Sequence, residues 1–259
     1  MDDASTNLAQ RQFGAVAARY TSSAVHADGP DLDALVAAAA PRGDERVLDL
    51  GCGTGHTALA LSSHVASVVG VDVTEAMLEQ ARLLATARGL ANATFIQADA
   101  AALPFPSQSF DLVASRYSAH HYPRPARALS EVVRVLAPGG TFLLVDTVAP
   151  DDPAHDTLLN AVEVLRDPSH VRDYAVAQWT EMLREAGFRP AMLGSWPLRL
   201  AFDAWLERMA TPPVASEAIV WLLDGASSAA RAALAVEPDH SFSIDVALLR
   251  GRLPASKDG

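Results

Sequence analysis

Three aspartates close successive apolar runs of the sequence and could bind a ligand rich in hydrogen-bond donors. Asp49, Asp72 and Asp99 each stand at the end of a run rich in Val, Leu, Ile or Phe. The carboxyl ends of parallel strands meet at one edge of a sheet, where ligands bind. A single acid of this kind is more often a solvated strand end or a helix cap. Three in succession favour a shared binding site.

A glycine cluster follows the first aspartate. Gly51, Gly53 and Gly55 form a G-x-G-x-G pattern, and His56 stands where a dinucleotide fingerprint would place its third glycine. Asp49 would repel a pyrophosphate on this loop. An ammonium beside a carboxylate, as in the methionine part of S-adenosylmethionine, would suit both the acid and the backbone N–H groups.

The remaining acids fit the other parts of that cofactor. Asp72 follows Asp49 at close to the ~20-residue separation at which an acid reaches ribose hydroxyls. Asp99 could accept from the adenine amine, Ala100 could donate its N–H to a ring nitrogen, and Met77 could pack on the adenine. The pattern predicts S-adenosylmethionine, with S-adenosylhomocysteine as product. An NAD(P)-dependent oxidoreductase is the alternative that Asp49 and the missing glycine disfavour.

Two neighbouring histidines follow the fourth apolar run. We expect the side chains of His120 and His121 to diverge, with His121 directed to the cofactor cleft. Either could act as a general base, and an orienting or core histidine is the competing interpretation. Arg116, in the same loop, could bind an acidic substrate, although an ion pair with a nearby carboxylate is the more common role.

The elements that must position these residues alternate along the chain. Apolar runs at residues 47–50, 68–72, 94–99, 110–115 and 141–146 alternate with helical patterns, which is typical of an α/β doubly wound parallel sheet. Within this core a helix is predicted over 126–136. Outside it the patterns predict helices over 1–40, 175–186 and 202–236, and strands over 188–200 and 241–249.

Composition narrows the class of protein. The 259 residues carry 20 Lys and Arg against 31 Asp and Glu, a net charge of −11, which opposes nucleic-acid binding. No apolar run reaches the ~18 residues of a membrane span. The start of the chain lacks a secretory signal, and Cys52 is the single cysteine. We expect a cytoplasmic protein with one domain, divided into a helical lid (1–40), a cofactor-binding core (41–150) and an acceptor side (151–259).

These motifs resemble those of class I S-adenosylmethionine-dependent methyltransferases, in the branch of the ubiquinone and menaquinone biosynthesis enzymes. The resemblance rests on residues 46–55, 71–72, 97–100, 103–105, 109–111 and 134–140. It implies a Rossmann-like seven-stranded sheet whose last strand is antiparallel. It also implies that Asp49, Gly51 and Gly53 hold the methionine end, and that Cys52 is a small residue in a tight loop.

The same resemblance extends to the ends of the chain. Residues 13–20 are similar to an amphipathic lid whose tyrosine covers the cofactor. The predicted cofactor-binding residues are Tyr20, Asp49, Gly51, Cys52, Gly53, Asp72, Val73, Met77, Asp99, Ala100 and Ser115. The predicted acceptor-binding residues are His26, Arg116, Tyr117, His170, Arg172 and Trp205.

The sequence thus predicts methyl transfer to O, N or C of a small-molecule acceptor by in-line displacement. Asp146, Asp151 and Asp152 lie close together, but their spacing is not that of a metal-ligand set, so we expect no metal. A protein that binds the cofactor without methylating, as a scaffold or to steer a cyclisation, is a second alternative. The oligomeric state, including a homodimer, is left open.

Overall fold

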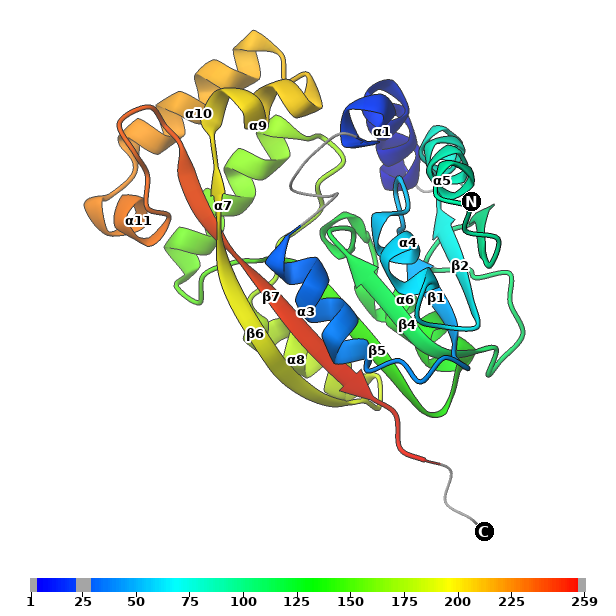
Figure 1. Cartoon of the computed structure of the whole chain (residues 1–259). Coiled ribbons are helices and arrows are strands. Elements are labelled where there is room, and N and C mark those ends of the chain that lie inside the picture. Colours follow the sequence, from blue (N-terminus) through cyan, green and yellow to red (C-terminus); the bar gives the residue numbers. More distant parts are fainter. Residues whose placement is uncertain (1–3, 22–28, 256–259) are drawn as a thin grey trace.

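A seven-stranded sheet organises the chain in a computed structural model that describes residues 4–21 and 29–255 (Figure 1). The strand order is β3-β2-β1-β4-β5-β7-β6, and β7 alone runs antiparallel to its neighbours. This confirms the predicted Rossmann-like sheet. The strands are β1 (Arg46–Leu50), β2 (Ser67–Asp72), β3 (Ala93–Gln97), β4 (Phe110–Arg116), β5 (Leu136–Val148), β6 (Arg189–Leu200) and β7 (Phe242–Arg252).

Helices cover both faces of this sheet. Alternate strand residues point to opposite faces, so Val47 of β1 packs with α3, α4 and α5, while Leu48 packs with α6 and α8. Burial on both faces explains why the strands are nearly continuous in apolar residues. The helices are α3 (Pro30–Ala39), α4 (His56–Ser62), α5 (Glu75–Ala87), α6 (Pro125–Val135) and α8 (Val176–Glu185).

A third apolar cluster lies beyond the sheet. Trp205, Leu223 and Phe242 are fully buried in it, where helices pack against the ends of β6 and β7 (Figure 1). These helices are α7 (Pro153–Arg166), α9 (Phe202–Met209), α10 (Pro213–Gly225) and α11 (Ser228–Ala233). Helix α1 (Ala4–Thr21) lies between α5 and α9, so it bridges the two sides of the carboxyl edge. Among the described residues, no helix is both long and apolar enough to cross a membrane.

The bounds of β3 and β5 differ from the predicted ones, and β7 continues to Arg252, past the predicted end at 249. β3 ends at Gln97, so Asp99 lies in the turn after it and not at a strand end. Its Oδ1 accepts the N–H of Ala101 at 2.8 Å, which holds the chain in that turn. β5 begins at Leu136, because a register shift in its pairing with β4 accommodates the Pro138-Gly139-Gly140 segment that we expected to separate helix from strand.

Two leucines of α5 provide a test of the packing. Leu78 is 0% exposed between the helix and the sheet, whereas Leu83 on the same helix is 64% exposed. We expect Leu78→Ala to lower the free energy of unfolding by about 2–5 kcal/mol, because it leaves a cavity in the core. Leu83→Ala, the matched control, should change it by less than about 0.5 kcal/mol. Equal losses in urea denaturation would contradict this packing.

Candidate active site

Two adjoining cavities open at the carboxyl edge of the parallel strands. The first, which we call the glycine-loop cavity, encloses about 1000 Å³ including space open to solvent, and is bounded by the loops after β1, β2, β3 and β4. Its wall contains eight of the predicted cofactor residues, Gly51, Cys52, Gly53, Asp72, Val73, Met77, Asp99 and Ala100. The second, the histidine cavity, lies beside it under α7 and α9.

The glycine loop has the conformation that its sequence requires. Gly51 and Gly53 have φ values of 69° and 51°, in the left-handed region that favours glycine. A Cβ at Gly51 would also lie 2.4 Å from Oγ of Ser118. The N–H of Gly53 donates to Oδ2 of Asp72 at 2.9 Å, which holds the loop against the end of β2.

Asp72 and Thr74 supply polar groups to the glycine-loop cavity. The Asp72 carboxylate accepts the N–H groups of Gly53 and Thr74, and burial raises its pKa. Each oxygen keeps a further lone pair for a hydroxyl donor. Oγ1 of Thr74 is buried and has no hydrogen-bond partner among the described residues. A cavity with a buried carboxylate, an unpaired hydroxyl and apolar walls suits a nucleoside.

Other predicted cofactor residues are placed differently. Asp49 is 1% exposed and lies behind the glycine loop, where Oδ2 accepts the N–H of Ala58 and burial raises its pKa to about 7. It does not line the cavity. Ser115 is also buried outside the wall, and it hydrogen-bonds Ser118, which does line it. The side chain of Tyr20 in α1 is not described, and His26 lies outside the described residues.

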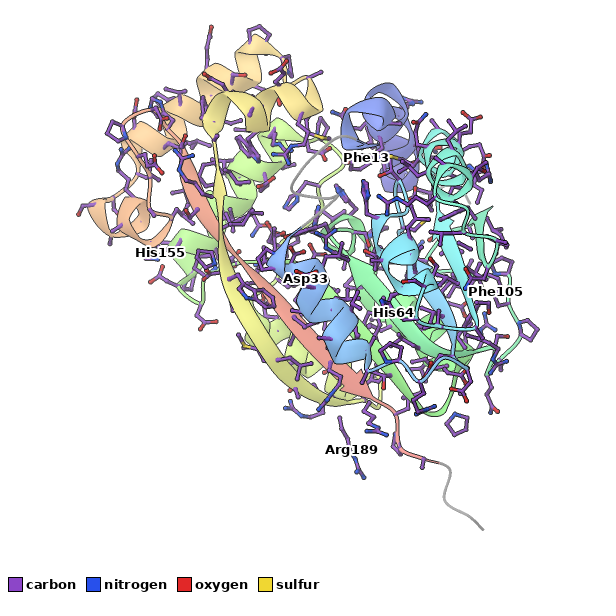
Figure 2. The ribbon with its side chains drawn as sticks, in the orientation of Figure 1. Phe13, Asp33, His64, Phe105, His155 and Arg189 are labelled. Carbon is purple, nitrogen blue, oxygen red and sulfur yellow. The ribbon has the colours of Figure 1, made fainter. Side chains whose placement is uncertain are left out.

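The histidine cavity combines polar and apolar side chains. It contains five of the predicted catalytic or acceptor residues, Tyr117, His120, His121, His170 and Trp205. It shares Phe13, Tyr117 and His121 with the glycine-loop cavity. Phe13 comes from α1 (Figure 2) and meets the ring of His121 edge-on, with 5.0 Å between centroids. One cavity therefore continues into the other past these three side chains.

The two histidines do not diverge, contrary to our expectation. They belong to a 3₁₀ turn, η1 (Ala119–His121), and their ring centroids are 4.2 Å apart. The turn is fixed from below, because Oδ2 of Asp146 accepts the N–H groups of Ala119 and His120 at 2.7 and 3.1 Å. Both rings are thereby brought into the histidine cavity.

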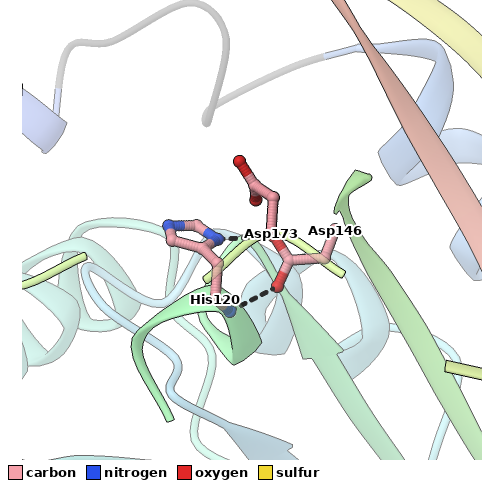
Figure 3. A group of neighbouring side chains, drawn as sticks. All are labelled: His120, Asp146 and Asp173. Atoms are coloured by element: carbon pink, nitrogen blue, oxygen red, sulfur yellow. Dashed lines mark hydrogen bonds and ion pairs between the residues drawn. The ribbon is translucent and has the colours of Figure 1, made fainter. Parts of the chain in front are cut away.

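His120 is paired with a buried carboxylate. Its Nδ1 lies 2.6 Å from Oδ1 of Asp146, which fixes the Nδ1–H tautomer and leaves Nε2 without a hydrogen-bond partner among the described residues (Figure 3). Burial lowers the pKa of His120, but the charge and hydrogen bond of Asp146, with nearby Asp173 and Glu163, outweigh this effect and raise it to about 9.

His121 has the opposite electrostatic environment. Burial and the neighbouring His120 lower its pKa to about 4, so the ring is neutral near pH 7. Its Nδ1 lies 3.0 Å from the carbonyl oxygen of Ser169. His121 lines the glycine-loop cavity and, with Phe13 and Tyr117, its junction with the histidine cavity, but it is a far weaker base than His120.

Arg116 forms an ion pair. Its Nε donates to Oδ2 of Asp31 at 2.6 Å, and the two side chains are only 3% and 8% exposed. This is the role that we considered the more common one. The pair joins the end of β4 to the start of α3, and Tyr117, with φ of 52°, lies under the Arg116 guanidinium.

The other predicted acceptor residues divide into two groups. His170 lines the histidine cavity and hydrogen-bonds Asn160, and burial together with His120 lowers its pKa to about 2. Trp205 lies in the cavity wall beneath Arg166. Arg172 does not line the cavity and forms an ion pair with Asp156. His170 and Trp205 are thus brought to the histidines, and Arg172 is not.

Sequence reasoning missed several residues of the site. Asp146 ends the predicted apolar run 141–146 and lies near the end of β5, so the rule applied to the other strand-end acids could have identified it. Phe13, Asp31 and Asp173 reach the site only through the packing of α1, α3 and the segment after α7, and no spacing in the sequence points to them.

One group of side chains could be considered for a metal. His120, Asp146 and Asp173 offer ligand atoms within 4.8 Å of one another, a combination that the sequence did not indicate. However, both oxygens of Asp146 already accept backbone N–H groups, and Oδ1 also faces the His120 ring. A cation would have to displace these donors, so the absence of a metal stays our prediction.

The ion pair of Arg116 can be tested by an isosteric change. We expect Asp31→Asn to lower the free energy of unfolding by about 3–5 kcal/mol, because it removes the opposite charge that faces a buried guanidinium. Asp33→Asn, on the exposed side of the same helix (Figure 2), is the control and should have little effect. Denaturation curves that coincide for the two variants would show that the pair contributes no stability.

Comparison with known proteins agrees with this geometry. A family model described as a methyltransferase domain matches residues 48–144. Over 244 residues the chain is 38% identical to an uncharacterized methyltransferase of Bacillus subtilis (strain 168), YcgJ, covering 92% of this chain and 96% of that protein. The crystal structure of YcgJ matches with a TM-score of 0.84, covering 87% of this chain and 99% of that one.

Two further proteins support the same assignment. A demethylmenaquinone methyltransferase of Clavibacter sepedonicus is 34% identical over 181 residues, covering 67% of this chain and 68% of that protein. The structure of a putative methyltransferase from Bacillus halodurans C-125 is 35% identical with a TM-score of 0.84, covering 88% of this chain and 100% of that one. The chain therefore belongs to the S-adenosylmethionine-dependent methyltransferases.

Proposed function

We propose that this chain transfers a methyl group from S-adenosylmethionine, bound in the glycine-loop cavity, to a small molecule in the histidine cavity. The observation that carries the proposal is the junction of the two cavities at Phe13, Tyr117 and His121. In-line displacement requires that donor and acceptor meet end to end with water excluded. Two cavities that share one wall provide that arrangement.

The residues of the glycine-loop cavity fit the cofactor. Asp72 would accept the ribose hydroxyls, Asp99 and Ala100 would bind adenine, and the buried Met77 would pack on the adenine face, since all four line this cavity. The backbone of Gly51 and Gly53 would hold the methionine end, with Asp49 acting from behind the loop. When bound, the cofactor supplies a methyl group on a positively charged sulfur.

The histidine cavity provides a base for an acceptor that loses a proton. With Nδ1 of His120 held by Asp146, Nε2 is the atom that can take a proton from the acceptor. His121, neutral and at the junction, would position the acceptor. Leu198, Trp205 and Ile244 give the cavity apolar walls that suit the hydrophobic body of a small molecule.

Helix α1 closes the site over both ligands. Gln10 donates to the carbonyl of Val73 on the cofactor side, and Gln12 donates to the carbonyl of Met209 on the acceptor side. Phe13 projects between these anchors into both cavities. The helix would therefore exclude water from the line of methyl transfer.

Direct assays distinguish methyl transfer from the two alternative functions. The methyltransferase relatives do not support an NAD(P)-dependent oxidoreductase. A scaffold or a cyclisation-steering protein would bind S-adenosylmethionine without forming S-adenosylhomocysteine. Formation of S-adenosylhomocysteine from a panel of phenols, acids and amines supports methyl transfer, whereas cofactor binding without turnover across the panel favours the scaffold.

Asp72 provides a test of the cofactor site. We expect Asp72→Ala to weaken S-adenosylmethionine binding by about tenfold or more, since charged hydrogen bonds contribute ~1.5–3 kcal/mol each. Asp151→Ala removes an exposed acid outside the cavity and should leave the affinity unchanged. Isothermal titration measures both variants, and circular dichroism checks that they are folded. Unchanged affinity in Asp72→Ala would remove this residue from the ribose site.

The pH dependence of turnover tests the base. Only unprotonated His120 can accept a proton, and its pKa of about 9 means that kcat/KM should rise with pH and level off above about 9. Asp146→Asn removes the charge that raises this pKa, so its rise should move to lower pH. We also expect kcat to fall by about 10²–10⁴.

His64→Gln is the control for this profile. His64 lies on the surface at the end of α4 (Figure 2), outside both cavities, and its loss should leave the pH dependence as it is. The readout is the rate of S-adenosylhomocysteine formation with the best acceptor of the panel. If Asp146→Asn kept the wild-type profile, His120 would not be the titrating base.

A further inference from the structure

Asp173 brings an unpaired carboxylate oxygen to the histidine cavity. The residue is 1% exposed and lines the cavity from the segment between α7 and α8. Oδ1 accepts the hydroxyl of Thr147, whereas Oδ2 is buried without a hydrogen-bond partner among the described residues. A buried acceptor left unpaired costs ~1–3 kcal/mol, so a donor from a ligand would be stabilised there.

The acids around Asp173 are already engaged. Asp146 faces His120, Glu163 pairs with Arg166, and Asp167 accepts the N–H and hydroxyl of Ser169. Among the oxygens of these four acids, Oδ2 of Asp173 is the one that is fully buried without a hydrogen-bond partner among the described residues. Figure 3 shows the Asp173 carboxylate extending away from that of Asp146, on the side of the imidazole ring.

The spacing fits two neighbouring donors of one ligand. One ring nitrogen of His120, one oxygen of Asp146 and one oxygen of Asp173 lie within 4.8 Å of one another, so the His120 ring and the Asp173 carboxylate are neighbours in the cavity. Hydroxyl hydrogen bonds span about 2.7 Å, so hydroxyls on adjacent carbons can reach both groups at once. The basic residues His120, Arg166 and Arg208 line this cavity together with the acids Glu163, Asp167 and Asp173, so a neutral hydroxyl donor can bind there without changing the balance of charge.

We propose that the acceptor carries two hydroxyl groups on adjacent carbons of an apolar body, one facing Nε2 of His120 and the other donating to Oδ2 of Asp173. This inference rests on the proposed methyl transfer and names its substrate class. Asp173 determines specificity: it holds the hydroxyl that is not methylated and thereby orients the one that is. The apolar body lies against Leu198, Leu200, Trp205 and Ile244.

Matched small acceptors test this with the full chain. Catechol has the two neighbouring hydroxyls, phenol lacks one, and ortho-aminophenol replaces one by an amine. We expect catechol to bind about 10- to 100-fold more tightly than phenol in isothermal titration with S-adenosylhomocysteine present, because phenol leaves Asp173 unpaired. Asp173→Ala should abolish this preference and leave phenol binding unchanged.

Two controls separate specificity from structure. Asp151→Ala removes an exposed acid outside the cavity, and it should keep the catechol preference. Asp173→Asn retains the size of the side chain with a single acceptor oxygen, so it should show a reduced preference even if the alanine variant fails to fold. An Asp173→Asn variant with the full preference would overturn the proposal.

Several other results of these binding measurements would overturn the proposed diol site or separate it from methyl transfer. Equal binding of catechol and phenol by the wild type, or tighter binding of ortho-aminophenol than of catechol, would overturn the proposal. So would a preference that appears only with added Mg²⁺ or Mn²⁺ and disappears with EDTA, which would assign His120 and Asp173 to a metal. If the preference depends on Asp173 but no acceptor yields S-adenosylhomocysteine, the diol site stands and methyl transfer fails. If S-adenosylhomocysteine forms but catechol is not preferred, methyl transfer stands and the diol site fails.

Discussion

The site is organised by one buried carboxylate near the end of β5. Asp146 accepts the N–H groups of Ala119, His120 and Thr147 and contacts the ring of His120. These bonds hold the 3₁₀ turn, direct both imidazoles into one cavity and keep the acid ionised, since His120 and the donors lower its pKa although burial raises it. Without this anion, neither the turn nor the tautomer of His120 would be defined.

The fold could be predicted wherever the signal is local. Strands such as β1 and β4 are apolar because both faces are covered, and Gly51 must be glycine because its φ is positive, so both features are written in short stretches of sequence. The cofactor side follows from the same rule, since strand ends converge by topology. Even there, the sequence could not distinguish residues that line the cavity from residues behind them. Asp49 lies behind the loop and not in the wall of the cavity.

The acceptor side could be predicted only in part. The histidines were found from their place after β4, but their shared orientation depends on Asp146, which is distant in sequence. Phe13, Asp31 and Asp173 reach the site from helices and connections that pack on the sheet in ways that periodicity does not encode. The ion pair of Arg116 could not be predicted in the same way, because its partner, Asp31 of α3, lies 85 residues away in the sequence.

Phe13 has a consequence for how the two ligands act on each other. A single aromatic ring forms wall for both cavities and touches the imidazole between them, so a ligand that shifts the ring in one cavity reshapes the other. Any such coupling must be reciprocal: the factor by which the cofactor changes the affinity for the acceptor equals the factor by which the acceptor changes the affinity for the cofactor. The order in which substrates enter and products leave would then be governed by a hydrophobic contact on α1, away from the reacting groups.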